Sequence, residues 1–259
     1  MKHLSMHRGS LRNILLSLVV LMLPAQRSVQ GYERMTREQV LEVLARVQEG
    51  QRPDLRNKDF RGLDLSSADF KGADLFGTHM GGGKFREANF ENCNLDLTIL
   101  RGAHLEGANL RNASLFGVVL VDGHLEGADL SSARLIADLQ RANLEGAKLI
   151  RGRYGADMTN QPMGKLRTSM VNANLKKSDL TGSDLSGCDL KFSNLTGANL
   201  TDADLTDCDL RNADFTDANM THTKLNKAMV AGAKFHGIQG KETLIGLESA
   251  SGVKEALFE

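Results

Sequence analysis

Large apolar residues recur at every fifth position over most of this chain. Leu, Phe or Met occupies seventeen consecutive fifth positions from Leu55 to Leu135. A second run of fourteen positions in the same phase extends from Met170 to Phe235, with Val230 as its only other residue type. A period of five fits neither an α-helix, which repeats about every 3.6 residues, nor a flat strand, which repeats about every two. Self-similarity at a fixed period is typical of repeat architectures.

The residues around each apolar position follow a common order. With the apolar residue at i, position i−2 is usually small, position i−1 is usually Asp or Asn, and position i+2 is often Gly, Asn or Asp. Asp, Asn and Gly tolerate the backbone angles of tight turns and can form local hydrogen bonds there. The pattern therefore predicts a chain with two inward positions of unequal size that bends once every five residues.

Two stretches carry this order most clearly, namely 68–75 (ADFKGADL) and 198–205 (ANLTDADL). They resemble the consensus of the pentapeptide-repeat family. The resemblance implies an all-β solenoid, a right-handed quadrilateral β-helix with four pentapeptides in each coil and the i side chains stacked inside. Residues twenty apart would then lie above one another at a spacing of about 4.8 Å, in about nine coils over residues 51–239.

The phase is interrupted in the segment 136–169. After Leu135 the next inward centres are expected at Leu139, Leu144, Leu149, Tyr154, Met158, Met163 and Met170, with unequal spacing. Residues 161–164 have the composition of a small loop, and basic residues outnumber acidic ones nearby. Two interpretations follow: a tolerated irregularity or bulge, or a bend or protruding loop that contacts a partner.

Residues 1–31 differ in composition from the repeat. Basic residues precede a ten-residue apolar or small stretch, Ile14 to Leu23, which stops at Pro24. A stretch of this length after a basic region is typical of a secretory signal peptide and is too short to span a bilayer. We expect cleavage near Gly31 and a periplasmic or secreted protein without a membrane span after cleavage. An uncleaved anchor is the alternative, because Arg27 precedes the predicted cleavage position.

Both ends of the predicted solenoid need a cover, because unpaired backbone groups invite edge-to-edge growth. Within 32–50, a helix over 36–48 is predicted to cap the first coil, with Thr36 and Gln39 as a capping box. In the tail 240–259, the residues predicted to cover the last coil are Ile245, Leu247, Leu257 and Phe258. A capped solenoid would be a monomer or an end-to-end dimer.

Charge and composition exclude several classes of protein. The chain has 259 residues, 32 basic and 32 acidic, no Trp and two Tyr. A nucleic-acid groove needs a basic stripe with interleaved aromatic residues, which the sequence lacks. No spacing indicates a catalytic triad or a phosphate-binding loop, so we expect neither an enzyme nor a cofactor. Cys93, Cys188 and Cys208 stand at inward i−2 positions, either as buried thiols or, for the last two, as a disulfide.

Two clusters of outward residues are candidate sites. His104 and His124 at i−1, with Glu106 and Glu126 at i+1, repeat at one-coil spacing, so that they form either a polar surface ladder or a divalent-metal site. Several outward positions near the fourth coil carry apolar residues. The residues predicted to form a docking patch there are Phe76, Ile99, Phe116, Val119 and Val121.

The sequence favours a non-enzymatic scaffold that is exported and docks an unidentified protein partner through its flat faces. The alternative comes from the family resemblance, since some pentapeptide-repeat proteins imitate the shape and charge of DNA and protect DNA gyrase. That role implies a strongly acidic surface. Only the segment 196–220, with six Asp and one Arg, is locally acidic in this near-neutral chain.

Overall fold

The computed structural model describes residues 31–48, 50–155 and 167–259. The chain divides into two compact units, Met1–Tyr32 and Glu33–Glu259. Of the first unit only residues 31 and 32 are described, so the predicted signal peptide lies outside the described residues except for Gly31. None of the described helices has the length and apolar composition that a membrane span requires.

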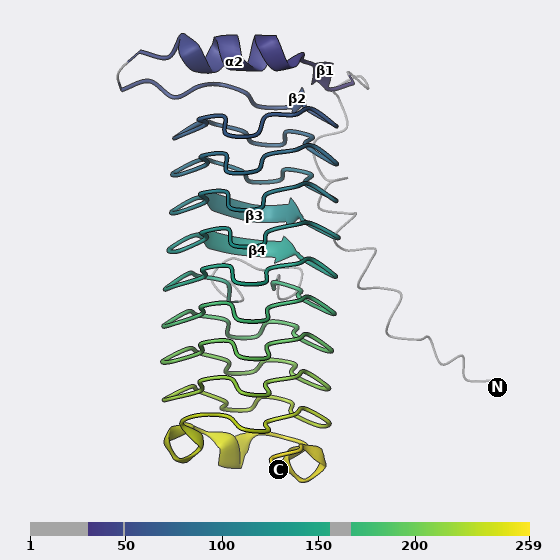
Figure 1. The fold of residues 1–259 in the computed structure, drawn as a ribbon, viewed down its shortest axis with the longest axis vertical. Coiled ribbons are helices and arrows are strands. Elements are labelled where there is room, and N and C mark those ends of the chain that lie inside the picture. The colour runs from purple at the N-terminus through teal and green to yellow at the C-terminus, as the bar shows by residue number, and fades with distance from the viewer. Residues whose placement is uncertain (1–30, 49, 156–166) are drawn as a thin grey trace, which may run out of the picture. The chain divides into compact units, whose positions relative to one another are not determined.

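Regular elements are short in Glu33–Glu259 (Figure 1). In chain order they are β1 (Glu33–Arg34), α2 (Arg37–Ala45), β2 (Lys58–Asp59), β3 (Ser114–Val119), β4 (Arg134–Asp138) and the 3₁₀ turns η1 (Lys241–Thr243), η2 (Leu247–Ser249) and η3 (Val253–Glu255). β1 pairs with β2 and β3 pairs with β4, both in parallel. The rest of this unit is held together by single β-bridges.

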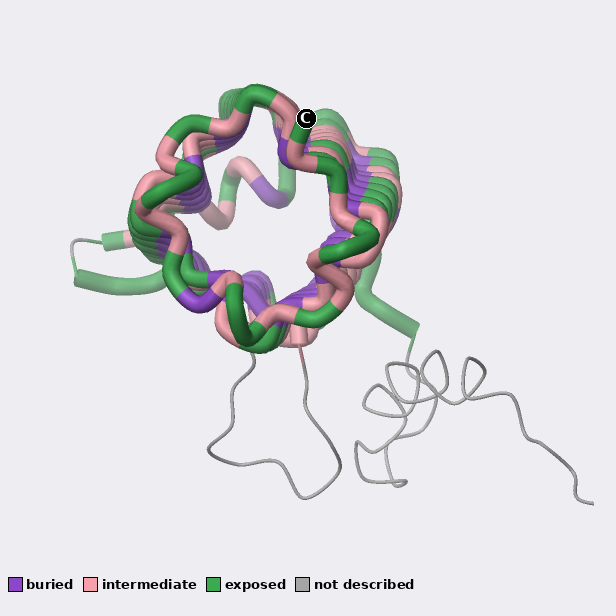
Figure 2. Tube along the Cα trace, turned by 90° about the horizontal axis from the view of Figure 1, so that it is seen from below, coloured by how far each residue is buried: buried purple, intermediate pink, exposed green. Residues whose placement is uncertain are grey.

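These bridges form four parallel ladders. A regular bridge joins residues twenty apart, as Asp54 with Asp74, and neighbouring ladders start at Asp59, Asp64 and Asp69. Four steps of five residues lead from Asp54 to Asp74, which lies on the same ladder. Each coil therefore has four sides. We number the ladders first to fourth in this order. Figure 2 shows the stacked coils along their axis, with buried segments recurring at the same places in successive coils.

The inward positions predicted from the five-residue period form the core. Every apolar position from Leu55 to Leu135 and from Met170 to Phe235 is at most 1% exposed. Side chains stack directly from coil to coil, as the rings of Phe70 and Phe90 do, with centroids 4.8 Å apart and planes 6° apart. Because one coil cannot bury its own apolar residues, this stacking couples the coils into one unit.

Each corner explains why Asp or Asn precedes the apolar residue. In one example, Asp64 Oδ1 accepts the backbone N–H of Ser66 at 3.2 Å, across the inward Leu65. Ser67 then takes a left-handed conformation with φ 58°, and Ala68 N–H closes the turn on the carbonyl of Leu65 at 3.1 Å. A carboxylate or amide at i−1 thus satisfies a backbone donor that the turn would otherwise leave without a partner.

The first irregularity in the predicted break is the loss of one residue in β4. β3 and β4 stay in register up to Phe116 and Ile136, after which Val118 pairs with Ala137. Gly117 therefore forms a bulge without a β4 partner, and its φ of 69° lies in the region that glycine tolerates best. The missing residue is thus absorbed at one corner, as the interpretation of a bulge predicted.

The second irregularity is an insertion. All four ladders continue from before residue 156 to after residue 166, and the bridged pairs are Asp138–Ser169, Asn143–Asn174, Lys148–Asp179 and Arg153–Asp184. Each pair is 31 residues apart, eleven more than a regular bridge, so the chain gains eleven residues between these two successive coils. Met158, Met163 and the predicted loop 161–164 lie outside the described residues. Among the described residues, the inward position after Tyr154 belongs to Met170.

The predicted N-terminal helix is present, and it ends at Ala45 rather than at residue 48. Its capping box is confirmed, because Thr36 Oγ1 accepts Gln39 N–H at 3.3 Å and Gln39 Oε1 accepts Thr36 N–H at 2.8 Å. Val40 is fully buried. The half-buried residues of the helix that pack against the core are Leu41, Val43 and Leu44.

The C-terminal tail has a six-residue period that the sequence analysis missed. Gly240, Gly246 and Gly252 have φ of 77° to 78°, and each precedes one of the 3₁₀ turns. These six-residue sides show that the predicted covering role of two tail residues was wrong. Ile245 and Leu257 are outward rungs, 44% and 48% exposed, and do not cover the coil end. The tail residues that pack against the core are Leu244, Leu247, Ala250, Val253, Ala256 and Phe258.

Candidate functional site

The predicted apolar patch lies around one corner of the central coils. Phe76 and Phe116 stand at i+1 positions two coils apart, and Ile99 and Val119 form a rung of the second ladder. These four residues are half-buried, whereas Val121 is only 5% exposed. Val121 therefore contributes little surface, and the accessible part of the patch consists of the other four residues.

Phe116 is held in this patch by a cation–π contact and by a backbone hydrogen bond. The Arg134 guanidinium lies 5.0 Å from the centre of its ring, a cation–π contact that covers part of one ring face. Asp96 Oδ1 accepts both the Phe116 N–H at 2.8 Å and the Ser114 hydroxyl at 2.6 Å. The bulged corner thus presents an aromatic ring beside a positive charge.

Two apolar neighbours of the patch escaped the sequence analysis. Ile136 pairs with Phe116 across β3 and β4 and is 5% exposed. Leu97 takes a left-handed conformation with φ 58° and lies against the bulge, since a Cβ on Gly117 would stand 2.5 Å from its Cδ2. Counting in twenties from Phe116 would have found Ile136. An apolar residue at the usual Gly or Asn position i+2 was the signal for Leu97.

The two histidine side chains stack on the third ladder, as their one-coil spacing predicts, and each has a glutamate side chain beside it. The rings of His104 and His124 are stacked, with centroids 4.5 Å apart and planes 5° apart. His104 Nδ1 lies 3.0 Å from Glu106 Oε1, and His124 Nδ1 lies 3.7 Å from Glu126 Oε1. Potential ligand atoms of His104, Glu106 and His124 all lie within 4.8 Å of one another. We call these four residues the His–Glu cluster.

Hydrogen-bond donors reach only some of the polar atoms of this cluster. Arg86 Nη2 lies 3.0 Å from both His104 Nδ1 and Glu106 Oε1, and Asn143 Nδ2 donates to Glu126 Oε1 at 2.5 Å. The second oxygen of each carboxylate, Oε2, is buried and has no hydrogen-bond partner among the described residues. Burial alone would raise the pKa of Glu106, but the hydrogen bond from His104 and the nearby Arg86 hold it below its usual value.

Carboxylates of the second ladder are fully partnered by comparison. Asp209 Oδ2 lies 2.8 Å from Arg211 Nη2 and 3.6 Å from Lys191 Nζ, and Lys191 also lies 3.1 Å from Asp189. Arg167 Nη2 approaches Asp189 at 3.5 Å. Burial would raise the pKa of Asp209, but the hydrogen bonds from Arg211 and the charge of Lys191 lower it. This group has the geometry of a structural ion-pair network.

The three cysteines are free thiols that line the core wall. Each donates to a carbonyl oxygen: Cys93 to Phe70 at 2.9 Å, and Cys208 to Leu185 at 3.0 Å. Cys188 does the same with Tyr154 at 3.2 Å. Burial raises the pKa of Cys93 to about 12 and that of Cys208 well above its usual value. Buried protonated thiols are poor nucleophiles and poor metal ligands.

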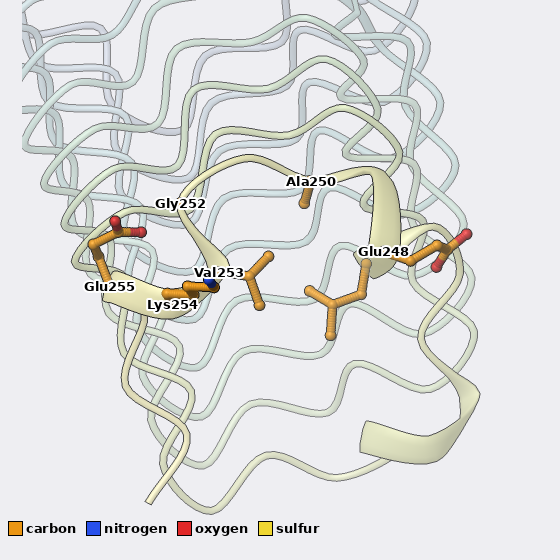
Figure 3. Close-up of a pocket in the computed structure, with 7 residues that line it drawn as sticks. Glu248, Ala250, Gly252, Val253, Lys254 and Glu255 are labelled. Atoms are coloured by element: carbon orange, nitrogen blue, oxygen red, sulfur yellow. The ribbon is translucent and has the colours of Figure 1, made fainter.

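A shallow hollow lies at the C-terminal end of the unit (Figure 3). Glu248 and Glu255 point away from it on opposite sides, while Val253 points into the end of the coil. Its lining residues are Leu247, Glu248, Ala250, Gly252, Val253, Lys254 and Glu255. No histidine, cysteine or hydroxyl group lines it, so we assign it no chemistry.

Comparison with protein families matches most of the coil. Residues 51–82, 84–121 and 108–136 match the family described as pentapeptide repeats (8 copies), and residues 167–235 match a pentapeptide repeat region. These segments together make up more than half of the chain. The chain belongs to the pentapeptide-repeat family. A comparison with curated proteins gave no significant match.

Solved pentapeptide-repeat structures resemble this protein. HetL, a pentapeptide repeat protein involved in heterocyst differentiation regulation from the cyanobacterium Nostoc sp. strain PCC 7120, is 27% identical with a TM-score of 0.56. The match covers 87% of this chain and 98% of HetL. QnrB1, a plasmid-mediated fluoroquinolone resistance protein, is 19% identical with a TM-score of 0.56, over 73% of this chain and 95% of QnrB1. The second likeness concerns the fold alone.

Proposed function

We propose that this pentapeptide-repeat protein is a non-enzymatic scaffold that docks a protein partner through its outer faces. One observation carries the proposal: the inward positions of both runs are at most 1% exposed, so the coil interior is filled by its own side chains. A filled interior leaves the outer ladders as the surface for binding. In this proposal the coil is right-handed with about nine turns, and α2 and the 3₁₀ turns cap its ends.

The apolar patch is the docking surface in this proposal. Phe76, Ile99, Phe116 and Val119 are half-buried apolar residues at outward positions, and polar side chains fill most of these positions in the other coils. Arg134 adds a positive charge beside the Phe116 ring. An apolar segment on the partner would match this surface, because apolar centres with polar rims are typical of protein interfaces.

We also propose that the protein is exported, on the strength of the signal-peptide pattern in residues 1–31. Cell fractionation with sequencing of the mature N-terminus tests this part separately. A periplasmic or secreted protein that begins near residue 32 is the expected result. A full-length cytoplasmic protein would remove export from the proposal without affecting the docking surface.

HetL supports a regulatory scaffold more than a catalyst, since that protein, at 27% identity, is described as involved in regulation. Protection of a topoisomerase is the weaker alternative. Ion pairs offset part of the charge of the acidic segment 196–220, among them Asp204 with Lys224 and Asp214 with Lys234, both at 3.1 Å. A surface that imitates DNA needs carboxylates that remain unpaired.

The docking proposal is tested by cross-linking in intact cells with Phe116→Ser and Phe192→Ser. Phe192 is a matched control, because its side chain is 55% exposed and lies outside the patch. We expect a defined cross-linked partner with the wild type and with Phe192→Ser, and its loss with Phe116→Ser at unchanged circular dichroism. Equal cross-linking by all three proteins would contradict docking at the patch. Protection of DNA gyrase from a fluoroquinolone by the purified protein would favour the alternative.

A further inference from the structure

We propose that the His–Glu cluster binds a divalent transition-metal ion of the Zn²⁺ type, with His104, His124 and Glu106 as ligands and Glu126 as the adjacent carboxylate. This inference goes beyond the scaffold function and does not depend on it. Two imidazoles and a carboxylate are a common ligand set for Zn²⁺. Mg²⁺ and Ca²⁺ prefer sites made of oxygen ligands, so they fit this cluster poorly.

The spacing of the coils brings the three ligands together. Donor atoms around a tetrahedral Zn²⁺ ion lie about 2.1 Å from the metal and therefore about 3.4 Å from one another. Here the three donor atoms lie within 4.8 Å of one another before any ion is bound. Side-chain rotation can close this difference, while the bridges from Lys84 to His104 and from His104 to His124 hold the backbone fixed.

Electrostatics of the cluster favour a cation. Glu106 Oε2 and Glu126 Oε2 are buried without a hydrogen-bond partner among the described residues. A buried acceptor that lacks a partner destabilises the fold, and more so when it carries charge. Glu145 stands at the corresponding i+1 position one coil beyond Glu126. The carboxylates of Glu106, Glu126 and Glu145 therefore stack at one-coil spacing. A bound divalent ion would offset the repulsion among them.

Arg86 is the competitor for this ion. Its guanidinium donates toward His104 Nδ1, which also faces Glu106 Oε1 at 3.0 Å. One ring nitrogen cannot accept a hydrogen bond from Arg86 and donate one to Glu106 at the same time. The hydrogen bonds of His104 Nδ1 with Arg86 and with Glu106 therefore cannot form together. A bound metal ion would replace the contact between Arg86 and His104. Removal of Arg86 should thus strengthen metal binding, an effect that a purely structural ladder does not explain.

The ion can reach the cluster from solvent. The side chains of His104 and His124 are 31% and 43% exposed. The three cysteines are buried in the core wall, so they do not compete for it. His222 provides a matched control: it pairs with Asp202 at 3.2 Å on an exposed corner and belongs to no cluster of three ligands among the described residues.

The test is titration of the untagged full-length protein with Zn²⁺ by calorimetry, supported by the absorption spectrum of the Co²⁺ form. We expect one site per chain in the wild type and in His222→Ala. His124→Ala should weaken Zn²⁺ binding about ten-fold or more, and Arg86→Gln should tighten it several-fold. All variants change outward side chains, and circular dichroism checks that each retains the fold.

A double variant, His104→Ala with His124→Ala, decides between this cluster and other histidines. It leaves the remaining five of the seven histidines in place. Loss of the site in the double variant supports the proposal. The proposal is overturned if the double variant binds Zn²⁺ as tightly as the wild type, if the wild type shows no stoichiometric binding, or if Arg86→Gln weakens binding.

Discussion

The second and third ladders rest on the same core and differ in how their outward charges are satisfied. On the second ladder, buried Asp189 and Asp209 are surrounded by Arg167, Lys191 and Arg211 at 2.8–3.6 Å. On the third ladder, the His–Glu cluster keeps two buried carboxylate oxygens without partners among the described residues. The periodic core thus determines where outward side chains stand, and the identity of those side chains decides whether they stabilise the coil or bind a ligand.

Substitution of a core leucine behind either ladder should lower the free energy of unfolding by the same amount. This is the largest effect that we expect. Leu190 follows Asp189, Leu105 follows His104, and both are at most 1% exposed. Leu190→Ala and Leu105→Ala should each lower the free energy of unfolding by about 2–5 kcal/mol, because each leaves a cavity in the stack. Denaturant unfolding of the two variants is the measurement. A difference of more than about 1 kcal/mol between them would show that the cores are not equivalent.

Loss of a charge from the partnered ladder should have a smaller effect. Asp209→Asn leaves Arg211 and Lys191 without their shared carboxylate, and we expect a loss of about 1–3 kcal/mol. Phe192→Ser, which changes an exposed side chain near these residues in sequence, serves as the control and should change the stability by about 0.5 kcal/mol or less. Wild-type stability in Asp209→Asn would mean that the network contributes nothing.

Acid should weaken the same ladder at its N-terminal end. Hydrogen bonds from Arg61 lower the pKa of Asp59 to about 2. Since the folded pKa lies below the unfolded value, this carboxylate stabilises the fold above about pH 4, and the contribution is lost as the pH falls toward 2. Asp59→Asn should therefore reduce the loss of stability between pH 5 and pH 2 by about 1 kcal/mol, after allowance for solvent around Arg61. Parallel pH profiles for the two proteins would contradict this assignment.

Removal of a charge from the third ladder should cost little in the absence of metal. Glu126→Gln keeps an acceptor for Asn143 and removes one charge from the stacked carboxylates. We expect the free energy of unfolding without metal to change by about 0.5 kcal/mol or less, in either direction. Thermal unfolding in the presence of a chelator is the measurement. A loss as large as that of Asp209→Asn would show that the His–Glu cluster is also a structural network.

The five-residue period was sufficient to predict the core, because an inward position depends only on counting from Leu55. It also placed His104 over His124, since a ladder residue recurs after twenty positions. The period could not predict how the break is resolved. The bulge at Gly117 depends on which corner absorbs a missing residue, and the apolar pattern does not show where eleven additional residues enter between the pairs Asp138–Ser169 and Arg153–Asp184.

Other features needed three-dimensional information. The six-residue sides that begin at Gly240, Gly246 and Gly252 turned Ile245 and Leu257 outward, against the prediction made from their hydrophobicity. Val121 at an i+1 position was expected to be exposed and is buried. The Oε2 atoms of Glu106 and Glu126, which have no partner in the described part of the chain, could not be foreseen, because the sequence does not show which donors reach them.

The comparison of the two ladders is tested most directly by a crystal structure of the full-length protein with Zn²⁺ and data collected at the zinc absorption edge. We expect one anomalous peak about 2.0–2.2 Å from a nitrogen of His104, a nitrogen of His124 and an oxygen of Glu106. The carboxylates of Asp189 and Asp209 should show none, because their own cations already satisfy them. A peak at the second ladder, or none at the third, would contradict the assignment of the third ladder as the metal-binding face.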